Sequence, residues 1–175
     1  MSNTLYIADF YNHRLMSYKA GAKNGTLGLG GLGSGITSTK LFYPVGLTYD
    51  SFSNSLVIAN VAAQTIVRYA LGATSWTLVA GNINGTIGSD STSFSYPIDM
   101  TYDPMGNMYV ADRDNHRIQF FSDGGVIGTT IAGITGVMGN NTMTFNGPWA
   151  VRLDSQLNLY VADTFNHRIQ KFLRY

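Results

Sequence analysis

The sequence predicts an all-β protein made of tandem repeats. Its 175 residues include 11 Tyr, 9 Phe and 20 Gly, and all ten acidic residues are Asp. Aromatic residues favour strands, Gly and Asp favour tight turns, and Glu, a good helix former, is missing. No window shows sustained helical periodicity, and one pattern recurs at nearly constant intervals. We therefore do not expect a helical bundle or a βαβ fold.

The recurring pattern is a segment of 14 residues. Its four copies begin at Leu5, Leu56, Met108 and Leu159, which are 51, 52 and 51 residues apart. A second signature, a proline followed by alternating apolar residues, stands at Pro44, Pro97 and Pro148. The repeat units are therefore roughly 1–30, 41–81, 94–133 and 145–175, the first and last being partial. Together they predict a single domain over residues 1–175.

Each complete unit contains four short strands, which we call a to d in chain order. Strand a begins at the proline, because a missing N–H costs least at a strand start. It ends at an Asp that opens a tight turn: Asp50, Asp103 and Asp154. Strand b is apolar and ends at a second structural Asp: Asp9, Asp112 and Asp163. A hairpin then leads into the half-polar strand c, and strand d is placed at Trp76–Ala80 and Val126–Ala132, ending at Gly.

Tandem four-stranded units of about 50 residues are the signature of a β-propeller, in which each unit is one blade. The chain opens at strand b of its first blade and ends at strand c of its fourth, which predicts three, four, four and three strands. We expect about four blades, either as an open arc or as part of a larger propeller. The apolar outer faces of an arc predict self-association or contact with further blades.

The motif Tyr-Val-Ala-Asp-x-x-Asn-His-Arg-Ile-Gln-x-Phe, preceded by Phe-x-x-Pro, resembles the NHL repeat family. Its Asn-His-Arg triplet stands at 12–14, 115–117 and 166–168, whereas the second unit has Asn60 for the Asp and Ala63-Gln64-Thr65 for the triplet. The resemblance covers nearly the whole chain and implies a propeller that serves as a binding platform for proteins or RNA. Some relatives are enzymes, such as the peptide-amidating lyase, so the resemblance does not select a function.

Composition excludes several kinds of site. The chain has no Cys, which excludes disulfides, thiolate metal sites and cysteine nucleophiles. The net charge is +1 and only 12% of residues are charged, so no strong field attracts nucleic acid or a membrane surface. No apolar run approaches the roughly 20 residues of a membrane span, so we expect no membrane insertion. We also expect no cofactor.

The repeated hairpin supplies the first candidate residues. They are the three histidines and the arginines that follow them: His13, His116, His167, Arg14, Arg117 and Arg168. A catalytic centre needs different residues that converge on one point, whereas these are copies of one position on separate blades. We therefore expect no catalytic or metal site here. We expect Asn to adopt the left-handed turn conformation, with His and Arg packed around the loop Asp. Contact with a ligand remains an alternative.

Departures from the repeat supply the second group of candidates. In strand a, the strand nearest the propeller axis, Asp99 stands where the other units have Gly46 and Ala150. Arg152 replaces a Thr, and Trp149 replaces Val or Ile. These residues either form an Asp99–Arg152 pair between adjacent blades or contact a ligand.

The connections between strands d and a are rich in Gly, Ser, Thr and Asn. They span 24–43, 82–96 and 134–147, and we expect flexible linkage there. In a propeller the d–a and b–c loops emerge on the same face, and binding residues often lie on such loops. Asn24, Asn84 and Asn140 begin Asn-x-Thr sequons in these regions and are possible glycosylation sites, which slightly favours an extracellular location.

The function predicted from these features is a non-enzymatic binding platform. Its ligand would be a protein, peptide or glycan bound on the face of the d–a and b–c loops. One alternative is a module that binds single-stranded RNA, although the basic residues form no stripe. A second alternative is a fragment of a hydrolase-like or lyase-like propeller enzyme.

Overall fold

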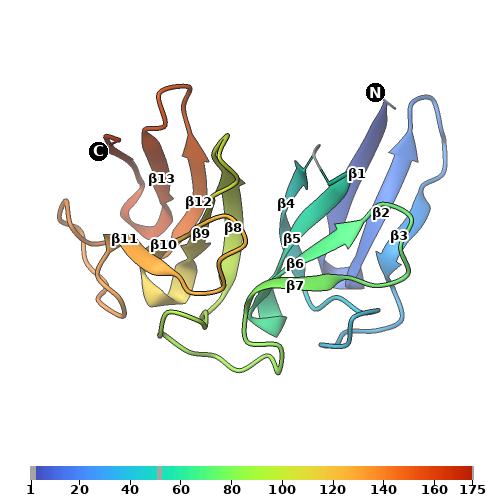
Figure 1. The fold of residues 1–175 in the computed structure, drawn as a ribbon, viewed down its shortest axis with the longest axis horizontal. Coiled ribbons are helices and arrows are strands. Elements are labelled where there is room, and N and C mark those ends of the chain that lie inside the picture. The colour runs from blue at the N-terminus through green and yellow to red at the C-terminus, as the bar shows by residue number, and fades with distance from the viewer. Residues whose placement is uncertain (1–2, 51–52, 175) are drawn as a thin grey trace.

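A computed structural model describes residues 3–50 and 53–174 of the protein. Within these residues, fourteen strands form four antiparallel sheets, which are the four blades (Figure 1). Blade 1 holds β1 (Thr4–Asp9), β2 (Arg14–Lys19) and β3 (Thr26–Gly30). Blade 2 holds β4 (Pro44–Asp50), β5 (Ser55–Asn60), β6 (Thr65–Ala70) and β7 (Thr77–Gly81). Blade 3 holds β8 (Pro97–Tyr102), β9 (Met108–Asp112), β10 (Arg117–Phe121) and β11 (Thr129–Gly133), and blade 4 holds β12 (Pro148–Leu153), β13 (Leu159–Asp163) and β14 (Arg168–Phe172).

Each sheet is a meander in which neighbours in sequence pair in space. The complete blades run a-b-c-d, whereas the described part of blade 1 contains strands b, c and d and that of blade 4 contains a, b and c. The all-β fold and the distribution of strands predicted from the repeats are therefore confirmed. Strand d ends at the Gly of the repeat as predicted, but β7 and β11 begin at Thr77 and Thr129 rather than at Trp76 and Val126.

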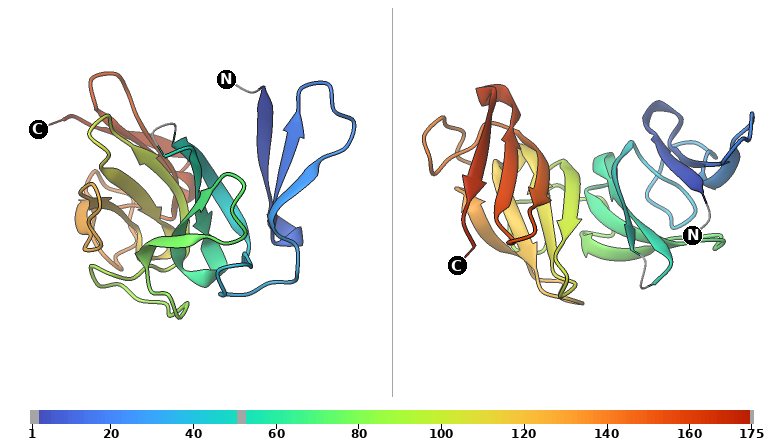
Figure 2. Two further views of the ribbon diagram at one scale, coloured as in Figure 1. Left: turned by 45° about the vertical axis from the view of Figure 1, so that its right-hand side comes forward. Right: turned by 90° about the horizontal axis from the view of Figure 1, so that it is seen from above.

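The blades form an open row rather than a closed ring. Strands β4, β8 and β12 lie side by side on the inner edge, and blades 1 and 4 stand at opposite ends of the row (Figures 1 and 2). Gly46 in β4 permits this closeness, because a Cβ there would stand 2.7 Å from the Ile98 carbonyl oxygen and 2.9 Å from the Asp99 Cα. The Thr48 hydroxyl also donates to the Met100 carbonyl oxygen at 3.3 Å.

Three apolar clusters hold neighbouring blades together, one at each junction. Every junction contains one fully buried anchor that stands three residues before the proline of strand a: Leu41, Phe94 or Phe145. The Phe94 ring lies 5.7 Å from that of Phe121, and the Phe145 ring lies 5.8 Å from that of Phe172. Because most of the core lies between blades, no blade buries its own apolar faces.

The prediction of a flexible connection over 24–43 is wrong in part, because this stretch contains β3. The Gly-rich run pairs with β2 and buries Leu29, since the alternation of Leu and Gly suits a strand with one packed face. Between strands b and c of each blade lies a single turn of 3-10 helix: η1 (Phe10–Asn12), η2 (Val61–Ala63), η3 (Arg113–Asn115) and η4 (Thr164–Asn166). In the described ranges, no helix has the length and apolar character needed to cross a membrane.

Candidate functional site

The b–c hairpin reverses the chain at His, not at Asn. His13, His116 and His167 have φ of 52°, 54° and 53°, and Gln64 takes the same place in blade 2 with φ of 57°. The prediction that Asn adopts the left-handed conformation is therefore wrong. Asn is the last residue of the 3-10 turn and uses its side chain instead, as Asn115 does by donating to Asp112 at 2.8 Å.

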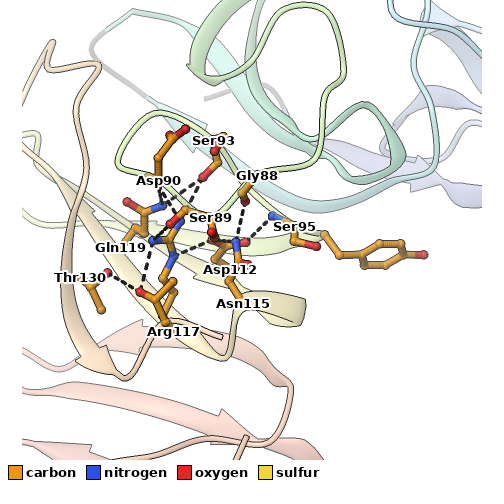
Figure 3. Close-up of polar contacts among 12 residues, drawn as sticks. Gly88, Ser89, Asp90, Ser93, Ser95, Asp112, Asn115, Arg117, Gln119 and Thr130 are labelled. Carbon is orange, nitrogen blue, oxygen red and sulfur yellow. Dashed lines mark hydrogen bonds and ion pairs between the residues drawn. The ribbon is translucent and has the colours of Figure 1, made fainter. Parts of the chain in front are cut away.

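In blade 3 the b–c hairpin forms hydrogen bonds with the loop that precedes β8, which is strand a of the same blade (Figure 3). The Asp112 carboxylate accepts Arg117 Nε at 2.8 Å and the Ser95 main-chain N–H at 2.8 Å. The other two nitrogens of Arg117 donate to loop carbonyls, including Nη1 to Ser89 at 2.7 Å and Nη2 to Asp90 at 2.9 Å. All three guanidinium nitrogens are therefore engaged within the protein.

Blade 4 repeats this arrangement, which we call the hairpin clamp. Arg168 Nε donates to Asp163 at 2.8 Å, Nη1 to the Asn140 carbonyl at 2.6 Å, and Nη2 to that of Asn141 at 2.6 Å. The Asn166 amide donates to the Gly139 carbonyl at 2.8 Å, just as Asn115 donates to Gly88. These contacts place the b–c hairpins and the d–a loops at one end of the blades, which we call the hairpin face.

The two clamps differ in burial, and the pKa values of their carboxyl groups shift in opposite directions. Desolvation raises the pKa of the Asp112 carboxyl, because neither it nor its partner Arg117 reaches solvent appreciably. The pKa of Asp163 lies below its usual value: burial opposes ionisation there, but donation by Asn166, Asn146 and Arg168 outweighs it. The charged form of Asp112 therefore depends more strongly on its hydrogen-bond partners than the charged form of Asp163 does.

The residue with left-handed φ also links each blade to the next. His13 Nδ1 accepts the Tyr43 main-chain N–H at 3.2 Å, and His116 Nδ1 accepts that of Gly147 at 3.2 Å. In blade 2 Gln64 Oε1 accepts the Tyr96 N–H at 2.7 Å, so the departure from the repeat preserves the link. His167, in the last blade, is exposed. Among the described residues no group of three or more potential metal ligands occurs.

Asp99, Arg152 and Trp149 lie along the inner strands. Arg152 Nη1 pairs with Asp99 Oδ2, and the same oxygen accepts the Val151 N–H at 3.0 Å, so this carboxylate joins blade 3 to blade 4. The expected pair between adjacent blades is therefore present. Trp149 does not join this pair; its ring lies 5.3 Å from the guanidinium of Arg113 on the hairpin face.

Exposed aromatic side chains gather at two places on the hairpin face. At the junction of blades 3 and 4, the Arg113 guanidinium lies 3.9 Å from the Tyr96 ring, beside Trp149 and Phe165. At the junction of blades 1 and 2, the rings of Phe10 and Tyr43 stack at 4.6 Å, with Tyr11 edge-on to both. Tyr11, Phe165 and Trp149 remain 81%, 55% and 40% exposed. Sequence reasoning missed all of these except Trp149, although Tyr11 and Phe165 occupy one equivalent position of the repeat.

The opposite end of the blades carries a hollow that we did not predict from the sequence. Two adjoining cavities of about 530 and 240 Å³ lie between blades 2 and 3. Arg68, Tyr102, Gly106 and Asp123 line both of them. Burial raises the pKa of Tyr102 to about 12. A signal in the sequence was available, since Arg68 stands where the other repeats have Ser, Phe and Lys.

The remaining predicted residues lie in turns and loops. Asp103 and Asp154 each accept main-chain N–H groups of the a–b turn, from Asn107 at 3.0 Å and from Asn158 at 2.9 Å. Asp50 accepts the Ser53 hydroxyl at 2.6 Å. All three sequon asparagines are exposed, but Asn24 lies in the turn between β2 and β3 rather than in a d–a loop. The reason is again β3, which places the d–a connection further along the chain.

Comparison with known proteins identifies the repeat. The sequence pattern of the NHL repeat matches residues 94–121 and 145–172. A comparison with curated proteins gives no significant match.

Several solved structures share the fold. They include an auxiliary nutrient binding protein from Bacteroides thetaiotaomicron, with a TM-score of 0.74, 20% identity, and coverage of 96% of this chain and 44% of that chain. A chain of a nidogen–laminin complex matches with a TM-score of 0.67, 15% identity and coverage of 98% and 60%. A streptogramin B lyase matches with a TM-score of 0.65, 13% identity and coverage of 98% and 46%. The protein thus spans between 44% and 60% of the length of these relatives, which include both binding proteins and an enzyme.

Proposed function

We propose that this chain, which contains NHL repeats, is a non-enzymatic recognition module that binds a protein, peptide or glycan on its hairpin face. The observation that carries the proposal is the set of exposed aromatic rings at the two blade junctions of that face. Aromatic faces stack on apolar ligand surfaces, including the C–H faces of sugars, and lose little conformational freedom on binding.

The role of the charged residues supports this class of ligand over RNA. In blades 3 and 4 the repeated arginines are occupied by carboxylates and loop carbonyls, and Arg113 donates to Asp114 at 2.7 Å. These guanidinium groups have little capacity left for phosphates, which dominate affinity for nucleic acids. The fold is shared by binding proteins and a lyase, so it does not decide between binding and catalysis. The exposed sequon asparagines support an extracellular location.

Intrinsic fluorescence tests the proposal directly. The chain has two tryptophans, of which Trp76 is buried and Trp149 lies on the hairpin face, so a ligand on that face changes mainly the signal of Trp149. The probes are a panel of soluble oligosaccharides, a panel of extended peptides and a single-stranded RNA. We expect a saturable change with an oligosaccharide or a peptide that persists at high salt.

Matched variants identify the face. Phe165→Ala should weaken binding, whereas Tyr49→Ala, which removes a half-exposed ring on the opposite face, should not. Saturable binding only to RNA, with an affinity that falls steeply with salt, would overturn the proposal in favour of a nucleic-acid module. Equal loss in both variants would show that the hairpin face is not the binding surface.

A further inference from the structure

The hollow between blades 2 and 3 has the size of a small-molecule site. Its larger part has a volume of about 530 Å³ and its smaller part about 240 Å³. Small-molecule sites typically measure roughly 300–1,000 Å³, so the larger part alone falls in this range. The walls come from β4, β6, β7 and β8 and from the turns after β8 and β10. Both blades contain all four of their strands, so the hollow belongs to a complete junction.

Arg68 of β6 lines both parts of the hollow. Its Nη1 donates to Asp50 at 2.6 Å and to Ser53 Oγ at 2.6 Å, so the charge of Arg68 is paired within blade 2. Within the described part of blade 2, neither Nε nor Nη2 of Arg68 has an acceptor. The guanidinium groups of Arg117 and Arg168, in contrast, donate from all three nitrogens. Arg68 therefore keeps N–H groups that can donate to a bound molecule.

Asp123, in the turn after β10, is the second charged residue that lines both parts. It lies against Gly106, where φ is 86° and a Cβ would stand 3.0 Å from the Asp123 Cγ. In the ranges that the structure describes, the exposed Asp123 carboxylate accepts no hydrogen bond and forms no ion pair, with Arg68 or with another cation. Arg68 and Asp123 thus border one space without contacting each other.

Aromatic and apolar side chains form the rest of the walls. Burial raises the pKa of Tyr102 to about 12; the charge of Arg68 opposes this rise and those of Asp50 and Asp123 add to it, so all three lie near the Tyr102 hydroxyl. Tyr49 contributes a second ring, which is half exposed. The smaller part continues over apolar side chains: Leu78, Val79, Met108, Phe121 and Val126. The hollow therefore combines apolar walls with one group that donates and one that accepts.

The other two junctions lack this arginine. At the junction of blades 3 and 4, Phe120 and Leu153 occupy the positions that Arg68 and Tyr102 hold between blades 2 and 3. At the junction of blades 1 and 2, Ser17 stands at the position of Arg68. The packing of neighbouring blades therefore does not require an arginine here, and the repeat does not account for it.

We propose that this hollow binds a saccharide through its hydroxyl groups, at a site separate from the hairpin face. A hydroxyl oxygen both accepts and donates hydrogen bonds, so one hydroxyl, or two on adjacent carbons, can accept from Arg68 and donate to Asp123. Hydrogen bonds to ionised partners are stronger than those between neutral groups. The C–H faces of the sugar ring pack on the rings of Tyr49 and Tyr102.

The charges of the lining favour a neutral ligand over an ion. A carboxylate or phosphate would meet three aspartates, Asp50, Asp103 and Asp123, against one arginine. An ammonium group could pair with Asp123, but it would approach the Arg68 guanidinium that lines the same space. Because like charges repel and a hydroxyl carries no charge, a neutral ring with several hydroxyls is the class that satisfies both side chains.

The methyl glycosides of glucose, galactose and mannose test the proposal with the full chain. Titration of each glycoside, followed by amide and tyrosine NMR signals, should give saturable shifts at residues 102–106 and 122–126 for at least one of them. Asp123→Ala, at an exposed side chain, should leave the fold intact and weaken this binding about tenfold or more, the usual effect of losing a charge-assisted hydrogen bond. Asp114→Ala removes an exposed carboxylate from the hairpin face of the same blade and should leave the affinity unchanged.

Four results would overturn the proposal. They are no saturable shifts with any of the glycosides at high millimolar concentration, shifts confined to residues outside the hollow, equal affinity of the Asp123→Ala and native chains, and tighter binding of n-butylamine or butyrate than of every glycoside. The test is independent of the ligand proposed for the hairpin face. A molecule in the hollow should leave the fluorescence of Trp149 unchanged, whereas a ligand on the hairpin face changes it.

Discussion

Replacing Asp112 by alanine should destabilise the protein far more than the same change at Asp9, although both residues hold the same position of the repeat. In blade 3 the change leaves the Arg117 guanidinium buried and without its carboxylate, and it removes the acceptor for Ser95 and Asn115. Breaking a buried ion pair by removing one partner costs about 3–5 kcal/mol. That is a large share of the roughly 5–15 kcal/mol that stabilises a typical domain.

The same hairpin in the other blades provides matched comparisons. Asp163 is fully buried but its partner Arg168 is 29% exposed, so we expect Asp163→Ala to cost roughly 2–3 kcal/mol. Asp9 and Arg14 are both partly exposed, and an exposed pair contributes less than about 1 kcal/mol. Asp123→Ala, on the surface, should change the free energy of unfolding by less than about 0.5 kcal/mol.

Urea unfolding followed by circular dichroism measures the four values. A second variant separates ion pairing from general damage, because Asp112→Ala combined with Arg117→Met removes the stranded charge and should recover much of the loss. If Asp9→Ala costs as much as Asp112→Ala, burial does not determine the strength of the clamp and the argument is wrong.

Three other predictions concern the blade junctions. Gly46→Ala should destabilise by about 1–3 kcal/mol in urea unfolding, since its Cβ would meet the backbone of β8 and force two blades apart; a neutral result would contradict the close approach. Tyr102 should ionise near pH 12. Because folding raises its pKa, the free energy of unfolding that it contributes is complete below about pH 10 and is lost as the pH rises through 12. The tyrosinate absorbance of the native chain and of Tyr102→Phe measures this ionisation, and a single transition near pH 10 would refute the prediction. Asp99→Ala should lower the free energy of unfolding by about 1–3 kcal/mol, because it leaves a buried N–H of β12 unpaired. Arg152→Ala, at an exposed side chain, should lower it by less than about 1 kcal/mol in the same assay. Equal effects would show that the ion pair, and not the hydrogen bond to the main chain, stabilises this junction.

Much of the fold was predictable because each repeat unit contains the same local sequence pattern, and the copies can be compared position by position. The proline of strand a, the Asp at the end of strand b and the apolar alternation recur together, so each copy supports the assignment of the others. The prediction was weakest where only one copy carried information, as at β3, whose Gly-rich sequence has no equivalent in the other units. The assignment of the left-handed residue to Asn12 rather than His13 was also wrong, because local preference favours Asn while the side chain of Asn12 is needed by Asp9.

The sequence by itself determined the all-β class, the blades and the order of their strands, because these depend on periodicity and turn chemistry within about 50 residues. Only the tertiary structure decided what equivalent residues do. Arg117 is enclosed by a d–a loop while Arg14 reaches solvent, although the residues around them in sequence are nearly alike. That difference depends on which segment lies across each hairpin and on which blade packs against each face. Both of these depend on contacts between segments that are distant in the chain. A repeat pattern in the sequence contains no information about such contacts.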